Sequence, residues 1–143
     1  MTNKTALVTG ASDGIGLEFC KILAAKGYDL ILVARRKDKL NEVAKSLTDR
    51  HASINCTVIT ADLSKPQAAQ KLFQATIKKE LQVDFLINNA GLLQNGFFTD
   101  LDLTAQENMI TVNIPAVRHQ YPHTSLWLRL MASRAPSSSM MTK

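Results

Sequence analysis

Cysteine, tryptophan and long apolar runs are all scarce in this chain of 143 residues. Its two cysteines, Cys20 and Cys56, lie within apolar patterns, which favours buried reduced thiols over a disulfide framework. No apolar run approaches the roughly 20 residues that a membrane helix needs. The N-terminus leads directly into an apolar strand without a signal-peptide pattern. These absences predict a cytoplasmic protein with no membrane partner.

Acidic residues and glycines are missing from residues 114–143, which hold three of the four prolines and five serines. This tail accounts for most of the net charge of +5, because residues 1–113 carry 13 Lys and Arg against 12 Asp and Glu. A nucleic-acid interface needs basic residues gathered along the fold. The distribution therefore predicts no nucleic-acid partner, and it divides the chain into a balanced portion, 1–113, and a divergent basic tail, 114–143.

Strand and helix patterns alternate over residues 5–113, as in a parallel α/β sheet with right-handed crossovers. Strands are predicted at Thr5–Thr9, Asp29–Ala34, Ile54–Ala61 and Val83–Asn88. Helices are predicted at Gly14–Lys26, at Lys37–Thr48, after a Ser64 cap, and from a capping box at Thr104–Glu107. The apolar spacing gives these helices inward faces of Ile15, Phe19, Ile22 and Leu23; of Leu40, Val43, Ala44 and Leu47; and of Ala69, Leu72, Phe73, Thr76 and Ile77. In the tail, the sequence indicates no element beyond a short helix at Leu126–Ala132.

A glycine-rich turn, Thr9-Gly10-Ala11-Ser12-Asp13-Gly14-Ile15-Gly16, follows the first predicted strand and opens a helix. Such a turn lets the backbone approach a pyrophosphate and directs a helix N-terminus at its negative charge. Three more motifs follow at the ends of later strands: Arg35-Arg36, Asp62-Leu63 and Asn88-Asn89-Ala90-Gly91.

Together with Asn113, these motifs resemble the short-chain dehydrogenase/reductase family over residues 1–113. The resemblance implies a Rossmann-like doubly wound parallel sheet in the order 3-2-1-4, truncated here after the fourth strand. It also implies a dinucleotide cofactor above the carboxyl ends of the strands. The cofactor residues it indicates are Gly10, Ser12, Asp13, Gly14, Ile15, Gly16, Arg35, Arg36, Asp62, Leu63, Asn89, Ala90 and Gly91.

Arg35 and Arg36 favour NADP over NAD as that cofactor. An NAD site needs a carboxylate near the end of the second strand, and this strand ends without one. Guanidinium groups match the oxygens of a 2′-phosphate, although a solvated basic helix start would look the same. Asp13 departs from the family pattern, in which NADP-preferring members often carry a basic residue. The resemblance further assigns Asp62 to the adenine amino group, with a plain strand-end cap as the alternative.

The residues that would complete hydride chemistry are missing. The family uses a serine and a Tyr-x-x-x-Lys motif, and no such motif occurs in this chain. Asn113 resembles the family asparagine that holds a water of the proton relay, or it is only a helix residue. His119, Tyr121 and His123 are interpreted as tail residues, and no Cys/His spacing indicates a zinc site.

Three functional hypotheses remain open. The first is an NADP-dependent oxidoreductase for a carbonyl or alcohol substrate, incomplete and poorly active as this chain. The second is a non-catalytic dinucleotide-binding module, and the third is a product without independent function.

The abrupt change after Asn113 is typical of a shifted reading frame or a substituted exon, which the coding DNA in all three frames would reveal. The substrate is not indicated, and we expect the family's oligomer interface to be missing. A methyltransferase or epimerase would leave Asn88–Gly91 and Asn113 unexplained.

Overall fold

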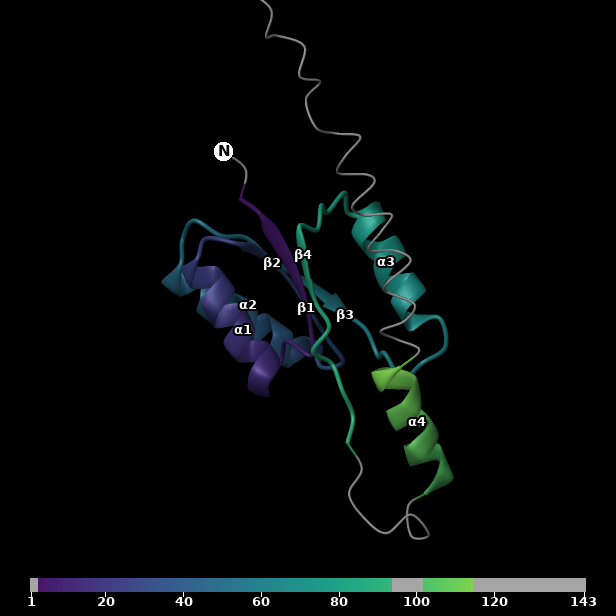
Figure 1. Cartoon of the computed structure of the whole chain (residues 1–143). Helices are drawn as coiled ribbons and strands as arrows, with labels where there is room; N and C mark the ends of the chain where they lie inside the picture. Colours follow the sequence, from purple (N-terminus) through teal and green to yellow (C-terminus); the bar gives the residue numbers. More distant parts are fainter. Residues whose placement is uncertain (1–2, 94–101, 115–143) are drawn as a thin grey trace, which may run out of the picture.

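The computed structural model describes residues 3–93 and 102–114, which form a parallel sheet flanked by helices (Figure 1). The strands are β1 (Thr5–Thr9), β2 (Asp29–Ala34), β3 (Cys56–Thr60) and β4 (Phe85–Ile87). The helices are α1 (Gly14–Ala25), α2 (Lys37–Arg50), α3 (Ala68–Lys78) and α4 (Leu103–Asn113). All strand pairs are parallel and the order is β3-β2-β1-β4. The predicted fold class and strand order are confirmed.

Two apolar clusters hold the helices on opposite faces of the sheet, with α1 and α2 on one side and α3 on the other (Figure 1). Alternate residues of each strand contribute to each cluster, so that Val8 packs with α1 and α2 while Leu7 packs with α3. The central strands β1 and β2 are consequently buried on both faces. Near-continuous apolar sequence is typical of such strands, and β1 and β2 coincide with their predicted ranges.

The outer strands are shorter than the sequence predicts. β3 pairs with β2 only over Cys56–Thr60, and β4 pairs with β1 over three residues, Phe85–Ile87. Asp84 precedes β4 and joins the neighbouring strand through its carboxylate, which accepts from the Thr5 N–H at 2.7 Å. Outer strands have a partner on one side only. The apolar runs in the sequence therefore predicted β3 and β4 to be longer than they are.

Helix α1 contacts the sheet through a different face from the predicted one. Its buried residues are Gly16, Cys20, Leu23 and Ala24. Ile15, Phe19 and Ile22 are 71%, 40% and 53% exposed, so only Leu23 of the predicted face is correct. The small residues allow the helix backbone to approach the sheet closely, which apolar spacing alone does not reveal.

The other helices agree in part with their predicted faces. α2 buries Leu40 and Leu47 as predicted, with Val43 and Ala44 packed against the same cluster. α3 buries Ala69, Leu72 and Thr76, and Phe73 packs against its cluster. Ile77, however, is 47% exposed, because it lies at the edge of that face in the last turn. The possible helix at 126–132 lies outside the described residues.

Both predicted N-caps are wrong. Ser64 does not begin α3; its hydroxyl and N–H donate to the Asp62 carboxylate at 2.7 and 3.1 Å, and the helix starts at Ala68. Thr104 lies inside α4, whose N-cap is Asp102, accepting from the Ala105 N–H at 3.0 Å. At α4 an aspartate thus provides the acceptor that was assigned to a hydroxyl, whereas the N-cap of α3 is Gln67, whose side chain forms no capping hydrogen bond.

The two cysteines are free thiols, with Cys20 buried and Cys56 half-buried. Burial raises the pKa of Cys20 to about 12 and that of Cys56 to about 11. Both groups are therefore neutral thiols at physiological pH. None of the described helices is long and apolar enough to cross a membrane.

Candidate functional site

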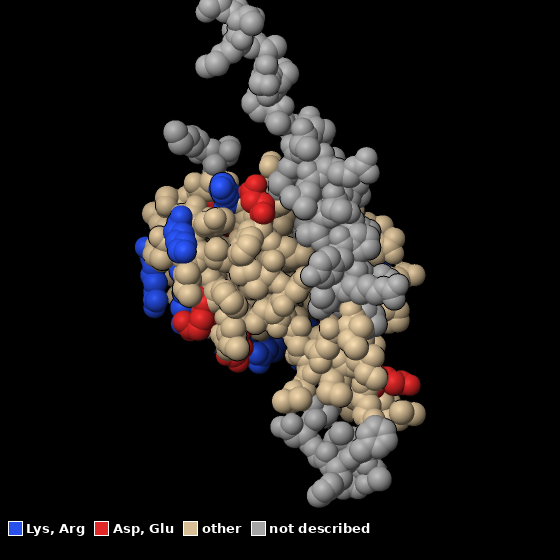
Figure 2. Space-filling model, in the orientation of Figure 1, with Lys and Arg blue, Asp and Glu red and all other residues tan. Residues whose placement is uncertain are grey.

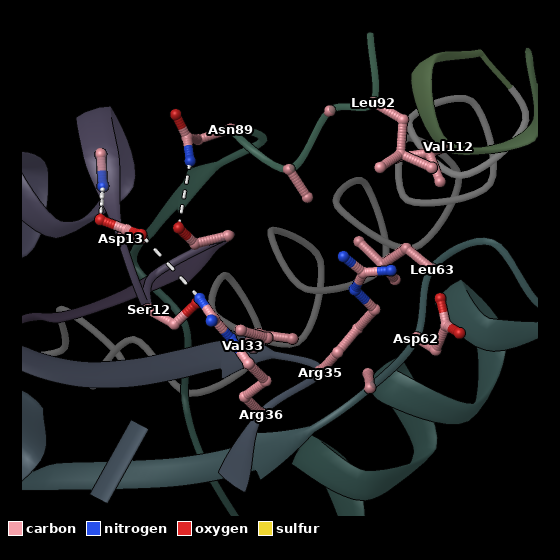
Figure 3. A pocket seen from close by; sticks show the side chains of 16 residues that line it. Ser12, Asp13, Val33, Arg35, Arg36, Asp62, Leu63, Asn89, Leu92 and Val112 are labelled. Atoms are coloured by element: carbon pink, nitrogen blue, oxygen red, sulfur yellow. Dashed lines mark hydrogen bonds and ion pairs between the residues drawn. The ribbon is translucent and has the colours of Figure 1, made fainter. Parts of the chain in front are cut away.

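A cavity of about 480 Å³ opens at the carboxyl ends of the four strands (Figure 3). Its walls come from the turn between β1 and α1, the end of β2, the segment after β3 and the segment after β4. Ligands of open parallel sheets bind at this edge, because the loops there converge and helix N-termini point toward it. The lining residues are Gly10, Ser12, Asp13, Gly14, Val33, Ala34, Arg35, Arg36, Ala61, Asp62, Leu63, Asn89, Ala90, Gly91, Leu92 and Val112.

The glycine turn forms the wall nearest α1. Gly10 and Gly14 have φ angles of 69° and 54°, in the left-handed region that glycine tolerates best. Asp13 caps α1, its carboxylate accepting from the Gly14 N–H at 2.8 Å. Gly16 has no room for a side chain, since a Cβ there would lie 2.2 Å from the Gly10 carbonyl oxygen. The turn is thus packed tightly against the first turn of the helix.

Thr9 and Asn89 connect this turn to the segment after β4. The Thr9 hydroxyl accepts from the N–H groups of Asn89 and Ala90 at 3.1 and 3.0 Å. The Asn89 side-chain amide donates back to the carbonyl oxygens of Thr9 and Gly10, at 3.0 and 3.4 Å. The glycine turn and the segment after β4 are therefore held in direct contact, as adjoining walls of the cavity.

Arg35 and Arg36 leave the end of β2 in different directions (Figure 3). Arg36 points toward the glycine turn, where its Nη2 lies 3.9 Å from Asp13 Oδ2. Arg35 points toward Leu63 on the far side of the cavity. Both arginines are exposed, so an anion entering from solvent can reach either guanidinium group.

Asp62 follows β3 and lies beyond Arg35 (Figure 3). The hydrogen bond from the Ser64 hydroxyl lowers the pKa of this carboxyl, with smaller contributions from the Ser64 N–H, Arg35 and Lys65. Asp62 is therefore ionised at neutral pH and can act only as a hydrogen-bond acceptor.

Asn113 does not line the cavity. Its side chain forms two hydrogen bonds with the backbone of Leu92, accepting from the N–H at 3.1 Å and donating to the carbonyl at 2.8 Å. This contact joins the end of α4 to the segment after β4. Leu92, its hydrogen-bond partner, and Val112, its neighbour in the sequence, both line the cavity. Asn113 therefore positions one wall of the cavity.

The structure brings eleven of the thirteen predicted cofactor residues to this one cavity. The other two, Ile15 and Gly16, lie in the first turn of α1 with Ile15 exposed and Gly16 buried. Leu92 and Val112 also line it, and neither was predicted from the sequence, since neither belongs to a strand-end motif. The described residues contain no group of three or more His, Cys, Asp or Glu placed to hold a metal ion. His119, Tyr121 and His123 lie outside them.

The sequence model for short chain dehydrogenases matches residues 4–136. The chain belongs to the short chain dehydrogenase family. The match extends past Asn113, the last residue of the motifs that resemble the family. The family assignment of the glycine turn and of the strand-end motifs is therefore established, whereas the individual role of each residue stays a prediction.

Among curated short chain dehydrogenases, the chain is 38% identical over 114 residues to an uncharacterised oxidoreductase of Staphylococcus saprophyticus. That alignment covers 80% of this chain and 48% of the relative. It is 37% identical over 111 residues to 11-beta-hydroxysteroid dehydrogenase 1A of Arabidopsis thaliana, covering 77% of this chain and 32% of that protein. The chain thus spans between a third and a half of the length of these relatives.

Solved structures of the family superpose on the same region. A short-chain dehydrogenase from Sphingobium yanoikuyae in complex with NADPH gives a TM-score of 0.79 at 32% identity, covering 91% of this chain and 50% of that one. A 7beta-hydroxysteroid dehydrogenase structure gives the same TM-score and identity, with 91% and 49% covered.

Proposed function

We propose that this chain binds a nicotinamide dinucleotide in the cavity at the strand ends, and NADP in preference to NAD. The observation that carries the proposal is the convergence of Gly10, Gly14 and Arg35 on one cavity. The glycine turn and the N-terminus of α1 suit a pyrophosphate, and the guanidinium groups at the end of β2 suit a 2′-phosphate. The relative solved with NADPH supports the same class of ligand.

The remaining lining residues fit the other parts of such a cofactor. Asp62 is an ionised acceptor beside the hydrophobic side chain of Leu63, a combination that suits an adenine ring with its amino group. Asn89, Ala90 and Gly91 present backbone to the cavity. When bound, the cofactor would supply hydride transfer. What this chain's own residues do is bind and orient it.

We propose that the 143-residue polypeptide binds the cofactor but reduces carbonyl compounds poorly. The sequence contains no Tyr-x-x-x-Lys, so the proton donor that the family uses for the developing alkoxide is missing. In a longer protein of the same family, this portion would serve as the cofactor half of an NADP-dependent carbonyl or alcohol oxidoreductase.

Titration of the purified chain with NADPH and NADH tests the cofactor proposal. We expect tighter binding of NADPH, followed by the enhancement of its nicotinamide fluorescence. Arg35→Ala removes a charge-assisted contact to phosphate, which contributes about 1.5–3 kcal/mol, so NADPH binding should weaken more than tenfold while NADH binding changes little. Arg50→Ala is the matched control, because Arg50 is an exposed arginine in the last turn of α2, outside the cavity. Equal affinity of the wild type for the two cofactors would contradict the proposal.

A further inference from the structure

A second cavity, of about 240 Å³, lies between the end of β3 and the helix α3. Its apolar wall includes Ile59 of β3 and Leu72 of α3, which pack in one cluster. Ala68 and Ala75 lie on the same side of the helix as Leu72, and their small side chains leave the hollow open. The cavity is therefore a depression with an apolar floor beside an outer strand of the sheet.

β3 presents unpaired backbone groups beside this cavity, because it is an outer strand of the described sheet. The Asn55 carbonyl and the Ala61 N–H, just before and after β3, both pair with β2, at 2.8 and 3.0 Å. Alternate residues of a strand face the same neighbour, so the backbone groups of Val58 and Thr60 point away from β2. Within residues 3–93 and 102–114, neither has a backbone partner outside the sheet.

Lys65 and Lys71 give the cavity a positive rim. Both line it and are exposed, and neither belongs to an ion pair in the described part of the chain. The one carboxylate of the lining, Asp62, already accepts from the hydroxyl and the N–H of Ser64. Lysines on an edge strand itself oppose pairing with other chains, whereas these two lie after the strand and on α3 and leave the edge open.

The open edge, the apolar hollow and the two lysines indicate one class of partner. A free strand edge binds an extended peptide through main-chain hydrogen bonds, and a hollow beside it accepts alternate side chains. Acidic residues two positions before and after an apolar one share its face of the added strand. Pairing of β3 between two copies of this chain would bring like charges together, and residues 114–143 contain no Asp or Glu.

We propose that the edge of β3 and the cavity beside α3 form a docking site for an extended acidic peptide segment of another protein, which joins the sheet as a strand beside β3. An apolar side chain of the peptide enters the cavity against Leu72, and its carboxylates pair with Lys65 and Lys71. The inference does not depend on the proposed cofactor binding, although Ala61 and Asp62 line both cavities.

Fluorescence anisotropy of a labelled peptide, Glu-Thr-Val-Thr-Glu-Thr, with the full 143-residue chain tests the proposal. We expect saturable binding that weakens as salt is added, and no binding of a peptide with lysine in place of both glutamates. Lys71→Gln should weaken binding about two- to fivefold, as for an exposed ion pair. Lys45→Gln is the matched control, because Lys45 is an exposed lysine of α2 outside the cavity.

The strand pairing has two measurements of its own. One peptide is N-methylated at its threonines and a second at its other residues, so that every side chain is kept while alternate main-chain donors are lost. One of the two should bind about tenfold more weakly. Bound peptide should also slow hydrogen exchange at the N–H groups of Val58 and Thr60, but not at that of Thr57, which faces β2.

Unchanged affinity of both methylated peptides, or unchanged exchange at Val58 and Thr60, would assign the binding to charge alone and overturn the inference. Equal binding of the lysine-containing peptide would overturn it as well, and so would the absence of saturable binding of the acidic one. An equal effect of Lys71→Gln and Lys45→Gln would place the peptide away from the cavity.

Discussion

Asn89 and Thr9 share two hydrogen bonds although they lie 80 positions apart in the chain: the Thr9 hydroxyl accepts from the Asn89 N–H, and the Asn89 side-chain amide donates to the Thr9 carbonyl. The third connection runs through Ala90, whose N–H also donates to the Thr9 hydroxyl. The glycine turn is therefore held in position by a side chain from the segment after β4, the strand that pairs with β1.

Asn89→Ala should destabilise the fold and weaken cofactor binding together. The substitution leaves the carbonyl oxygens of Thr9 and Gly10 without the amide that donates to them, at a cost of about 1–3 kcal/mol in the free energy of unfolding. Urea denaturation measures this cost. Asn88→Ala is the control, because Asn88 is the exposed neighbour, and the prediction fails if both variants lose the same stability.

Gly16→Ala should cost more stability than Gly27→Ala. A Cβ at Gly16 would lie 2.4 Å from the Asn89 amide nitrogen and closer still to the Gly10 carbonyl oxygen, so the backbone has to move. We expect about 3 kcal/mol, the upper part of the range for an overpacked site. Gly27 has a φ of 78° and open space around it, so alanine there costs about 1–2 kcal/mol of conformational strain. Thermal unfolding of the two variants would show the reverse order if the packing at Gly16 were unimportant.

Ser64→Ala should change the acid titration of the fold. The Ser64 hydroxyl is the largest cause of the lowered pKa of Asp62. A carboxyl with a lowered pKa in the folded state stabilises the fold at neutral pH, and this contribution is lost as the pH falls through that pKa. In Ser64→Ala the Asp62 pKa should rise toward its ordinary value of 3.8.

The stability difference between the wild type and Ser64→Ala should accordingly be largest at neutral pH and shrink as the pH falls below about 3.8. A carboxyl-detected NMR titration of Asp62 measures the pKa directly. Ser46→Ala on the exposed side of α2 controls for the loss of a hydroxyl. A stability difference that stays constant down to acid pH would rule out the carboxyl as its origin.

Carbonyl reduction by the 143-residue chain should be weak or absent. General acid catalysis contributes about 10²–10⁴-fold to a rate, and neither tyrosine is followed four positions later by a lysine, since Leu32 follows Tyr28 and Ser125 follows Tyr121. NADPH oxidation with a panel of ketones and aldehydes is the measurement. Rapid turnover by preparations free of contaminating reductase would show that another residue supplies the proton.

Phe85→Lys should reduce aggregation of the chain. Phe85 is 51% exposed on β4, the outer strand of the described sheet, and the face seen in Figure 2 has a broad central area without charged side chains. Exposed apolar edges invite pairing with other chains, and lysine on such an edge opposes it. We expect the wild type to be marginally stable and aggregation-prone, with a larger monomer fraction for Phe85→Lys in size-exclusion chromatography.

Thr60→Lys separates the effect of position from that of charge, because Thr60 is an exposed residue on the opposite outer strand, β3. The two variants carry the same net charge, and only Phe85→Lys should restore the monomer. A wild-type chain that is monodisperse and unfolds reversibly above about 60 °C, beyond most mesophilic domains, would contradict the expected instability.

The central strands and the strand-end motifs were predictable from sequence because their physical signals are local. A strand buried on both faces has to be apolar throughout, and β1 and β2 show this directly. The motifs at Gly10–Gly16, Arg35-Arg36, Asp62-Leu63 and Asn89–Gly91 each end a strand, and parallel strands bring their carboxyl ends to one edge. The topology then places them around one cavity.

The features that the sequence did not predict depend on contacts between distant residues. Ile15, Phe19 and Ile22 show helical apolar spacing, yet the helix turns its small residues inward because Gly16 has to pass close to Gly10 and Asn89. The Asn113 side chain forms hydrogen bonds with the backbone of Leu92, a contact that no sequence motif indicated, and its catalytic role stays a prediction. Neither contact is encoded by a pattern within one element.

Because the chain is synthesised from its N-terminus, the pairing of β4 with β1 forms after the other strand pairs of the described sheet can form. β4 leaves the ribosome after the glycine turn, Arg35 and Asp62. The Ile87 carbonyl, which accepts a hydrogen bond from the Thr9 hydroxyl, lies 78 positions downstream of Thr9. Until that strand arrives, the nascent sheet has three strands and the Gly10 carbonyl lacks its donor from Asn89. The cavity therefore lacks the wall that carries Asn89 until β4, a strand of three residues, docks against β1.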